Sequence, residues 1–421
     1  MKQYPPPAVA ALLVLVLGLA PIASCADHAH SHIAFASGAH EESVATPAPL
    51  SIAASPVPVN APAVANDARV ILVTIDGVRA EDVFEGANPS LRPGTKVDAY
   101  RTPEAVMPRL HRLAATRGVA IGADQPGCGV ARTASGMNVS LPGYLEIFTG
   151  RKTRCRDNQC ARVEMPTVLD EAANAGLSPV ASIGSWDILD RAVSKGGASV
   201  FVAEGAQRWP GQRPLVVGNL EQLVEAGEQT EAFPGVGKYR PDALTSAIAL
   251  EYFRTTAPRV FHVGLGDADE WGHRNDYGAY LEAVGKADAF IGQLSDTLDA
   301  MGDRGAHTTV IVTTDHGRNK DFQHHGAFSF TSARTFVVAF GARVPVRGIA
   351  CATHDVSLAD IAPTMRALLG LPADSSQDAG RPIEEILPSS SAGSDHLVAG
   401  AAAGATGAAG SGSGVGRLQR P

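Results

Sequence analysis

Three strongly apolar runs in this sequence each end abruptly at a carboxylate residue, and two of them continue to a histidine. The runs cover residues 69–75, 260–265 and 309–314, and a fourth patch, His324-His325-Gly326, follows the last of them. Short runs of β-branched residues are typical of strands buried on both faces of a parallel sheet. The polar residues that follow the runs are Asp76, Asp269, His273, Asp315, His316 and His325.

In a parallel sheet of this kind the ligand crevice lies outside the carboxyl ends of the strands. Residues far apart in the sequence are therefore expected to meet at one edge. Because carboxylates and imidazoles are the usual donors of a hydrolytic metal site, the runs predict a metal-lined sheet edge.

Strand-like and helix-like segments alternate through the middle of the chain. This alternation predicts an α/β fold, a doubly wound and mostly parallel central sheet with helices on both faces. The predicted strands are residues 69–75, 179–183, 199–203, 259–265, 308–314 and 335–341. The predicted helices are residues 103–117, 165–175, 241–254, 277–301 and 356–369. The Gly- and Pro-rich segment from 196 to 240 is expected to form a small inserted cap over the site.

The first 25 residues have the features of a signal peptide, with an apolar stretch from Ala8 to Leu19 that is too short to span a bilayer comfortably. The stretch ends in Ile22-Ala23-Ser24-Cys25, which resembles the lipobox of bacterial lipoproteins. This resemblance implies cleavage and lipidation at Cys25, and hence membrane anchoring. Ordinary secretory cleavage after Ala26 stays open as the alternative.

Two low-complexity segments flank the rest of the chain. Ala, Pro, His and Ser dominate residues 26–66, and Ala, Gly and Ser dominate residues 389–421. We expect the first to be a disordered tether and the second a disordered tail. Residues 67–388 remain as one domain, large but reasonable for an α/β sheet with an inserted cap.

Charge and cysteine usage narrow the classes of function. The net charge is −8, and the basic residues are dispersed, so no nucleic-acid-binding patch is expected. In an exported chain, Cys155 and Cys160 predict a local disulfide. Whether Cys128 and Cys351 also pair stays open, because that bridge rests only on counting. A zinc ribbon needs two close cysteine pairs, and only one exists.

Ser140 is followed two residues later by Pro142, a pattern that suits a helix N-terminus. There the free backbone N–H groups point at an anion. The serine could serve only as a helix cap, or it could be a nucleophile if a metal lowers its pKa.

Several short motifs around these residues resemble the alkaline phosphatase superfamily, and within it the nucleotide pyrophosphatase/phosphodiesterase-like branch. They occur in the family's order over nearly the whole core. The motifs are Thr74-Ile-Asp76-Gly, Ser140-x-Pro142 with Thr149-Gly150, Asp269-x-x-Gly272-His273, Thr314-Asp315-His316-Gly317, His325-Gly326, Asp360-Ile-Ala-Pro363-Thr364 with Leu369-Gly370-Leu371-Pro372, and Gly380-Arg381-Pro382-Ile383.

The resemblance implies that residues 67–388 form an alkaline-phosphatase-like catalytic domain with two zinc ions (Zn2+), other divalent metals not being excluded. One ion would be held by Asp269, His273 and His325. The other would be held by Asp76, Asp315, His316 and the Ser140 oxygen. Ser140 would attack phosphorus and form a phosphoryl-serine intermediate. Mixed carboxylate and imidazole sets do suit zinc.

Two further positions bear on the choice among relatives. Asn158, between Cys155 and Cys160, falls where the phosphodiesterase branch keeps an asparagine that donates to a phosphate oxygen; a plain turn residue is the alternative. A formylglycine sulfatase needs an arginine where this chain has Tyr144. Classical sulfatase activity is therefore not expected.

Three other polar residues compete for roles. The spacing Asp-x-x-Gly-His favours Asp269 over Asp267 as a ligand, His324 is expected to lie at the surface or behind the ligands, and His262 is expected to pack in the core.

The predicted function is an exported, periplasmic or outer-membrane, hydrolase of small phosphoric esters: phosphodiesters, phosphomonoesters or phosphonates. The alternatives are a sulfatase-like or phosphoglycerate-mutase-like enzyme of the same fold, or a catalytically silent surface lipoprotein used as a binding module.

Overall fold

The computed structural model describes residues 67–91, 99–197, 199–206 and 219–388. The predicted signal peptide, tether and tail lie outside these ranges. None of the helices within them combines the length and the apolar character that a membrane crossing requires.

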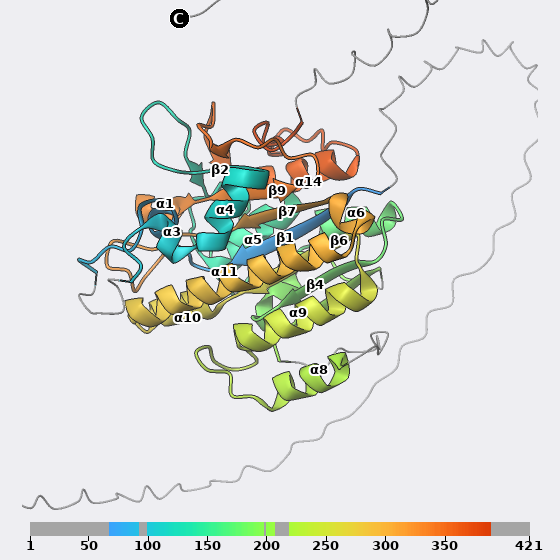
Figure 1. Cartoon of the computed structure of the whole chain (residues 1–421), viewed down its shortest axis with the longest axis horizontal. Coiled ribbons are helices and arrows are strands. Elements are labelled where there is room, and N and C mark those ends of the chain that lie inside the picture. The colour runs from blue at the N-terminus through green and yellow to red at the C-terminus, as the bar shows by residue number, and fades with distance from the viewer. Residues whose placement is uncertain (1–66, 92–98, 198, 207–218, 389–421) are drawn as a thin grey trace, which may run out of the picture. The chain divides into compact units, whose positions relative to one another are not determined.

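An eight-stranded sheet forms the centre of the domain (Figure 1). Its strands are, in spatial order, β10 (Gly348–Ile349), β2 (Gly118–Ile121), β9 (Val337–Gly341), β7 (Thr308–Thr313), β1 (Arg69–Ile75), β6 (Val260–Leu265), β4 (Val180–Gly184) and β5 (Val200–Glu204). Within this sheet only β9 runs antiparallel to its neighbours. A second, small sheet has the order β11 (Val356–Ser357), β3 (Ala131–Arg132) and β8 (Arg334–Thr335). The predicted mostly parallel sheet is confirmed.

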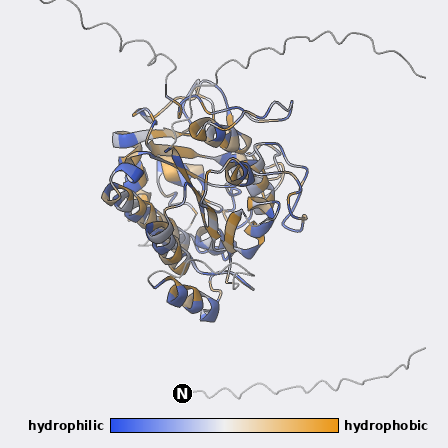
Figure 2. Ribbon diagram, turned by 90° about the vertical axis from the view of Figure 1, so that its right-hand side faces the viewer, coloured by the Kyte–Doolittle hydropathy of each residue, from blue (hydrophilic) through white to orange (hydrophobic). Residues whose placement is uncertain are grey.

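Helices cover both faces of the sheet, and hydrophobic residues concentrate in the layer between them (Figure 2). Side chains of β1 alternate between the two layers: Ile71 and Val73 join one apolar cluster, and Val70 and Leu72 join the other. The first cluster includes residues of α1 (Ala80–Glu85), α3 (Pro103–Val106), α4 (Pro108–Arg117), α9 (Asp242–Thr256), α10 (Asp267–His273) and α11 (Tyr277–Ala300). The second includes residues of α5 (Ser140–Thr149), α6 (Val168–Asn174), α7 (Asp190–Val193) and α14 (Ile361–Leu369).

Three predicted helices are clearly shorter than expected, and the one predicted over 165–175 is α6, which covers only Val168–Asn174. The segment predicted as one helix over 103–117 is broken into α3 and α4 at Met107, because Pro108 disfavours a helical conformation in the residue before it. The segment predicted over 356–369 begins instead with β11 and a 3-10 turn, η2 (Leu358–Asp360), before α14 starts.

Parts of the predicted cap belong to the main fold. Strand β5 lies at the edge of the sheet, and α8 (Leu220–Gln229) packs on α9. Beside the candidate site lies the loop that follows α8, where the ring of Phe233 packs edge-on against Trp271 of α10 at 5.0 Å between centroids. Residues 207–218 lie outside the described residues, so the cap stays a prediction there. The remaining short helices are η1 (Asp187–Leu189), α12 (Asp303–Ala306) and α13 (Phe330–Ala333).

Candidate metal centre and nucleophile

The carboxyl ends of three adjacent strands carry the candidate site. Asp76 directly follows β1, Asp315 follows β7 by two residues, and Asp269 lies in α10, which begins two residues after β6. Because β7, β1 and β6 are neighbours in the sheet, their ends meet at one edge. In α10, residues four apart lie on one face of the helix, which brings His273 beside Asp269.

Two compact groups of potential ligands result. In each group the donor atoms lie within 4.8 Å of one another. The rings of His316 and His325, one from each group, stack with centroids 3.9 Å apart, so the groups are adjacent. The groups are Asp76, Asp315 and His316, and Asp269, His273 and His325. The structure thus brings together six of the seven sequence-predicted ligands, all except Ser140, in the two expected sets, and their role as ligands stays a prediction.

Backbone carbonyls orient two of the histidines. His316 Nδ1 lies 2.9 Å from the Gly317 oxygen, and His325 Nδ1 lies 2.9 Å from the Asn138 oxygen. A carbonyl can only accept, so both Nδ1 atoms carry hydrogen and both Nε2 atoms keep a free lone pair. His316 Nε2 lies 3.5 Å from Asp76 Oδ1 and 3.4 Å from Asp315 Oδ2. This arrangement is typical of histidines that bind a metal through Nε2.

The electrostatics of the first group favour a cation. Burial, reinforced by the neighbouring carboxylates of Asp315 and Asp269, raises the pKa of Asp76 well above its usual value. Burial and the charge of Asp269 raise the pKa of Asp315 to about 8. Asp315 Oδ2 is buried without a hydrogen-bond partner. A divalent ion would supply the missing partner and relieve the repulsion, so the residues fit the metal that the fold family implies.

The second group is partly neutralised by the protein itself. Burial acts to raise the pKa of Asp269, but the charges of Arg318, His325 and His273 outweigh it and hold that pKa well below its usual value. Asp269 therefore stays ionised, as a metal ligand must.

Ser140 lies at the start of α5, close to the carboxylate of Asp76. It is the first residue of α5, after the extended residue Val139, and it is not the helix cap. Its Oγ lies 3.4 Å from Asp76 Oδ1 and 3.2 Å from His316 Nε2. The helix approaches this closely because position 143 is glycine, where a Cβ atom would lie 2.3 Å from the Asp315 carbonyl oxygen. The hydroxyl thus faces the first ligand group.

Asn158 lies beside Ser140, as its predicted role requires. Its Oδ1 accepts a hydrogen bond from the Leu141 backbone N–H at 2.9 Å. The side-chain NH2 group remains as a donor near the nucleophile. A disulfide between Cys155 and Cys160 closes the loop that carries Asn158, as predicted. The substrate-binding role of Asn158 stays a prediction.

The second disulfide settles a pairing that the sequence left open. Cys128 is bonded to Cys351, across 223 residues of sequence. It fastens the loop before β3 to the segment that follows β10.

Two residues near the ligands were missed by sequence reasoning. The fully buried Arg318 forms an ion pair with Asp269 and donates to the Gln323 carbonyl at 2.8 Å. Asn138, in a left-handed conformation at φ 51°, donates to the Gly326 and Ser329 carbonyls at 2.7 and 3.1 Å. Asparagine tolerates this conformation, but no local pattern marked either residue.

The competing polar residues lie elsewhere. Asp267 accepts from the Tyr239 hydroxyl at 2.7 Å and from the Asp242 backbone N–H at 3.1 Å, and it belongs to neither ligand group. His324 is exposed and pairs with Asp321 at 2.9 Å. His262 is fully buried in β6.

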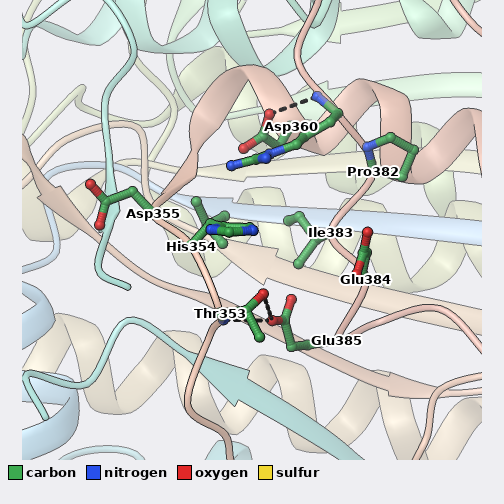
Figure 3. Close-up of a pocket in the computed structure, with 10 residues that line it drawn as sticks. Thr353, His354, Asp355, Asp360, Pro382, Ile383, Glu384 and Glu385 are labelled. Carbon is green, nitrogen blue, oxygen red and sulfur yellow. Dashed lines mark hydrogen bonds between the residues drawn. The ribbon is translucent and has the colours of Figure 1, made fainter. Parts of the chain in front are cut away.

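The two C-terminal motifs contact each other through hydrogen bonds, and Figure 3 shows the pocket that they line. The Arg381 backbone N–H donates to Asp360 Oδ1 at 2.9 Å. The Ile383 N–H donates to the Thr364 hydroxyl at 2.9 Å. The hollow beside them is small, about 30 Å³, and residues of both motifs line it. These motifs therefore stabilise the fold.

The comparisons with known proteins agree on the class of fold. Residues 218–373 match the Metalloenzyme superfamily. The 2,3-bisphosphoglycerate-independent phosphoglycerate mutase of Prochlorococcus marinus (strain MIT 9303) is 26% identical over 204 residues, covering 44% of this chain and 36% of the mutase. The mutase of Halobacterium salinarum is 34% identical over 119 residues, covering 27% and 22%. The chain spans little more than a third of the first relative's length, 36%.

Solved structures extend the likeness to most of the domain. A candidate sulfatase from Bacteroides thetaiotaomicron has a TM-score of 0.51 at 12% identity, covering 75% of this chain and 74% of that one. A 2-O GAG sulfatase has a TM-score of 0.50 at 12% identity, covering 76% and 73%. At this identity the likeness concerns the fold alone. The chain is thus similar in fold to these proteins, and its residues 218–373 match the Metalloenzyme superfamily.

Proposed function

We propose that this chain is an exported, metal-dependent hydrolase of phosphoric esters (diesters, monoesters or phosphonates) of the nucleotide pyrophosphatase/phosphodiesterase-like branch, with Ser140 as its nucleophile. The observation that carries the proposal is the position of the Ser140 hydroxyl. It lies at the start of α5, within 3.4 Å of Asp76 and 3.2 Å of His316, beside two adjacent groups of metal-binding side chains.

We assign two divalent ions, zinc in the first instance, to the two groups. Asp269, His273 and His325 would hold one, and Asp76, Asp315, His316 and the Ser140 oxygen the other. Bound there, the ions would lower the pKa of the Ser140 hydroxyl and stabilise charge on the phosphoryl oxygens.

The protein's own groups position the ester. The Ser140 oxygen attacks phosphorus, and the bond from phosphorus to the alcohol oxygen breaks, leaving a phosphorylated Ser140. Water then hydrolyses this ester and returns the serine. The Asn158 amide, held by its bond to Leu141, donates to a phosphoryl oxygen, and the free N–H groups at the start of α5 face the same charge.

A phosphoglycerate-mutase-like phosphoryl transfer is the second candidate, because the curated relatives carry that name over the aligned region. It differs in the acceptor of the phosphoryl group, which is a second hydroxyl of the substrate rather than water. A sulfatase is disfavoured because Tyr144 stands where a formylglycine sulfatase needs an arginine.

One set of assays separates the candidates. The purified protein, metal content measured, is offered bis-p-nitrophenyl phosphate, p-nitrophenyl phosphate, p-nitrophenyl sulfate and 3-phosphoglycerate. We expect about two metal ions per chain, phosphoester hydrolysis, and loss of that activity in Ser140→Ala. The hydrolase proposal fails if the metals bind and none of the phosphoesters is cleaved. Full activity in Ser140→Ala would refute the nucleophile assignment.

Export and anchoring form part of the proposal. The two disulfides support an oxidising compartment. Cys25, outside the described residues, would carry the lipid. In a bacterial host, Cys25→Ser should move the protein from the membrane fraction to the soluble fraction; an unchanged distribution would contradict anchoring through Cys25.

A further inference from the structure

One asparagine, Asn138, connects the loop that carries Ser140 to the loop that carries His325. It lies two residues before Ser140, and its backbone carbonyl accepts a hydrogen bond from His325 Nδ1 at 2.9 Å. Its side-chain Nδ2 donates to the carbonyls of Gly326 and Ser329 at 2.7 and 3.1 Å. A single residue thus bonds both to the predicted ligand and to the segment that follows it.

The two loops lie side by side because both lead to the small sheet. Strand β3 precedes the first loop, strand β8 follows the second, and the two strands pair antiparallel. Directly after β3, the Thr133 N–H donates to the Ala333 carbonyl at 3.0 Å. The Phe328 N–H donates to the Gly136 carbonyl at 3.4 Å. Asn138 lies beyond these contacts, next to Ser140, and its side chain makes the connection there.

The hydrogen count shows that an amide is required at position 138. Carbonyl oxygens can only accept, so the NH2 group of Asn138 must face Gly326 and Ser329, and both of its hydrogens are used. The Oδ1 atom accepts from the Thr133 hydroxyl at 2.6 Å. The residue is only 1% exposed, so loss of these bonds would leave buried polar groups unpaired. An aspartate would place an oxygen against two carbonyl oxygens.

The backbone of Asn138 is in the left-handed region, at φ 51°. Glycine adopts this conformation most easily, and asparagine tolerates it. If the position required only a turn, glycine would serve it at least as well. The side-chain bonds therefore distinguish asparagine from glycine here, and the difference can be tested.

The Ser140 loop is also held from the other side, by α5 itself. Glu146 of this helix is buried, and its carboxylate accepts from the N–H groups of Ala134 and Ser135 at 2.7 and 2.6 Å. The loop is thus fixed to the helix that begins with Ser140 and, through Asn138, to the segment that follows His325. A movement of that segment would therefore reach the start of α5.

The bond to the Asn138 carbonyl determines where the His325 ring points. With Nδ1 engaged, Nε2 lies 3.1 Å from His273 Nε2 and 3.9 Å from Asp269 Oδ1, within the second ligand group. The same ring stacks on His316 of the first group. A backbone carbonyl in this position orients a metal-binding histidine.

We propose that Asn138 is a positioning residue that sets the distance between the nucleophile Ser140 and the ligand group that contains His325. It acts through these two residues rather than on the substrate. The inference rests on the proposed function for its effect on catalysis, while its effects on the loop and on metal binding can be measured without any activity.

Two variants separate the side-chain bonds from the turn. Asn138→Gly permits the left-handed conformation and removes every side-chain bond. Asn138→Asp keeps the size and the acceptor for the Thr133 hydroxyl but loses both donors. The control is Asn88→Asp, which makes the same change of amide to carboxylate at an exposed asparagine whose Oδ1 accepts from the Ser90 N–H.

The first test is hydrogen exchange of residues 324–333 in the chelated full-length protein, followed by mass spectrometry. We expect faster exchange of this segment in both Asn138 variants, because its connection to the Ser140 loop is lost, and no change in Asn88→Asp. Exchange at the wild-type rate in both Asn138 variants would overturn the proposal.

The second test is zinc binding, measured by titration calorimetry on the chelated protein. The binding step that disappears in His273→Ala identifies the ion held by the second ligand group. We expect both Asn138 variants to bind this ion about 10- to 100-fold more weakly than the wild type. Wild-type affinity in both variants would contradict the proposal.

The third test is kinetic and uses saturating zinc. Both Asn138 variants should lower kcat by about 10- to 100-fold with little change in KM, because Asn138 contacts the reacting groups of the protein and not the ester. A raised KM at unchanged kcat would place Asn138 in substrate binding instead and would refute the positioning role. Asn88→Asp should keep both constants.

The outcomes distinguish this inference from the proposed function. If the wild-type protein cleaves no phosphoester, the proposed function fails, and hydrogen exchange and zinc affinity decide the role of Asn138. If the wild-type protein is active and both variants keep full kcat and zinc affinity, the positioning role is refuted and the hydrolase assignment stands.

A milder variant covers the case in which neither Asn138 variant folds. Thr133→Val keeps the shape of the side chain and removes only the hydroxyl that donates to Asn138. It should show the same changes in hydrogen exchange, zinc affinity and kcat to a smaller extent. Wild-type behaviour of Thr133→Val in all three measurements would then count against the proposal.

Discussion

Replacing Glu204 by glutamine should stabilise the protein, and increasingly so as the pH rises. The carboxyl group is buried at the edge of the sheet, and its Oε2 has no hydrogen-bond partner. Glutamine has nearly the same shape, and its amide oxygen can accept from the Ser182 hydroxyl as the Glu204 carboxyl oxygen does. The substitution therefore removes the ionisation and little else.

The magnitude follows from the two pKa values. In the folded protein the pKa of Glu204 is about 8, against 4.5 for the group in an unfolded chain. Between these values the folded state holds a proton that the unfolded state has lost, so the free energy of unfolding falls as the pH rises. The slope is about 1.4 kcal/mol per pH unit, and the loss approaches roughly 5 kcal/mol at pH 8. Below pH 4.5 this contribution disappears.

Urea denaturation at pH 5, 6, 7 and 8, followed by tryptophan fluorescence with the disulfides oxidised, measures the effect. We expect the unfolding midpoints of wild type and Glu204→Gln to lie close at pH 5 and to diverge steadily toward pH 8, the variant being more stable. Glu225→Gln, an exposed substitution in α8, is the control and should follow the wild type. A difference between Glu204→Gln and wild type that does not change with pH would refute the reasoning.

Three further predictions concern the site and its framework. Adding zinc to the chelated protein at 100 times its Kd should raise the free energy of unfolding by about 2.7 kcal/mol, measured by urea denaturation; an equal gain in Asp315→Asn would contradict the assigned ligand set. Asn158→Ala should lower kcat/KM by about 100-fold at unchanged metal content, and a loss of metal instead would show that Asn158 acts on the ligands. Replacing Cys128 and Cys351 together by serine should cost about 2–5 kcal/mol of stability, and unaltered urea midpoints would exclude this contribution.

Much of the sheet could be predicted because its strands are buried on both faces. The run at residues 69–75 coincides with β1, and five further predicted strands fall within two residues of β4, β5, β6, β7 and β9 at each end. Short elements with a weak apolar signal were missed. Strand β2 has only four residues, and α10 consists largely of polar and small residues, among them the predicted ligands Asp269 and His273.

The ligand groups could be predicted for a geometric reason. Asp76 and Asp315 follow strands that are adjacent and parallel, so the ends of the strands determine where both residues lie. Arg318 could not be predicted in the same way. Its partner Asp269 lies 49 residues earlier in the chain, and nothing in the local sequence indicates that this arginine is buried.

The buried polar side chains of Ser182, His262 and Thr74, which are joined by hydrogen bonds, show where sequence reasoning reaches its limit. Ser182, His262 and Thr74 are ordinary residues for strands, and each is best interpreted alone as a packed side chain, as His262 was. They become a connected line only because β4, β6 and β1 are neighbours and because Ser182 and His262 are paired in register. A shift of one residue in that register would turn His262 to the opposite face of the sheet. The order and register of the strands, rather than the residue types, therefore decide whether these side chains meet.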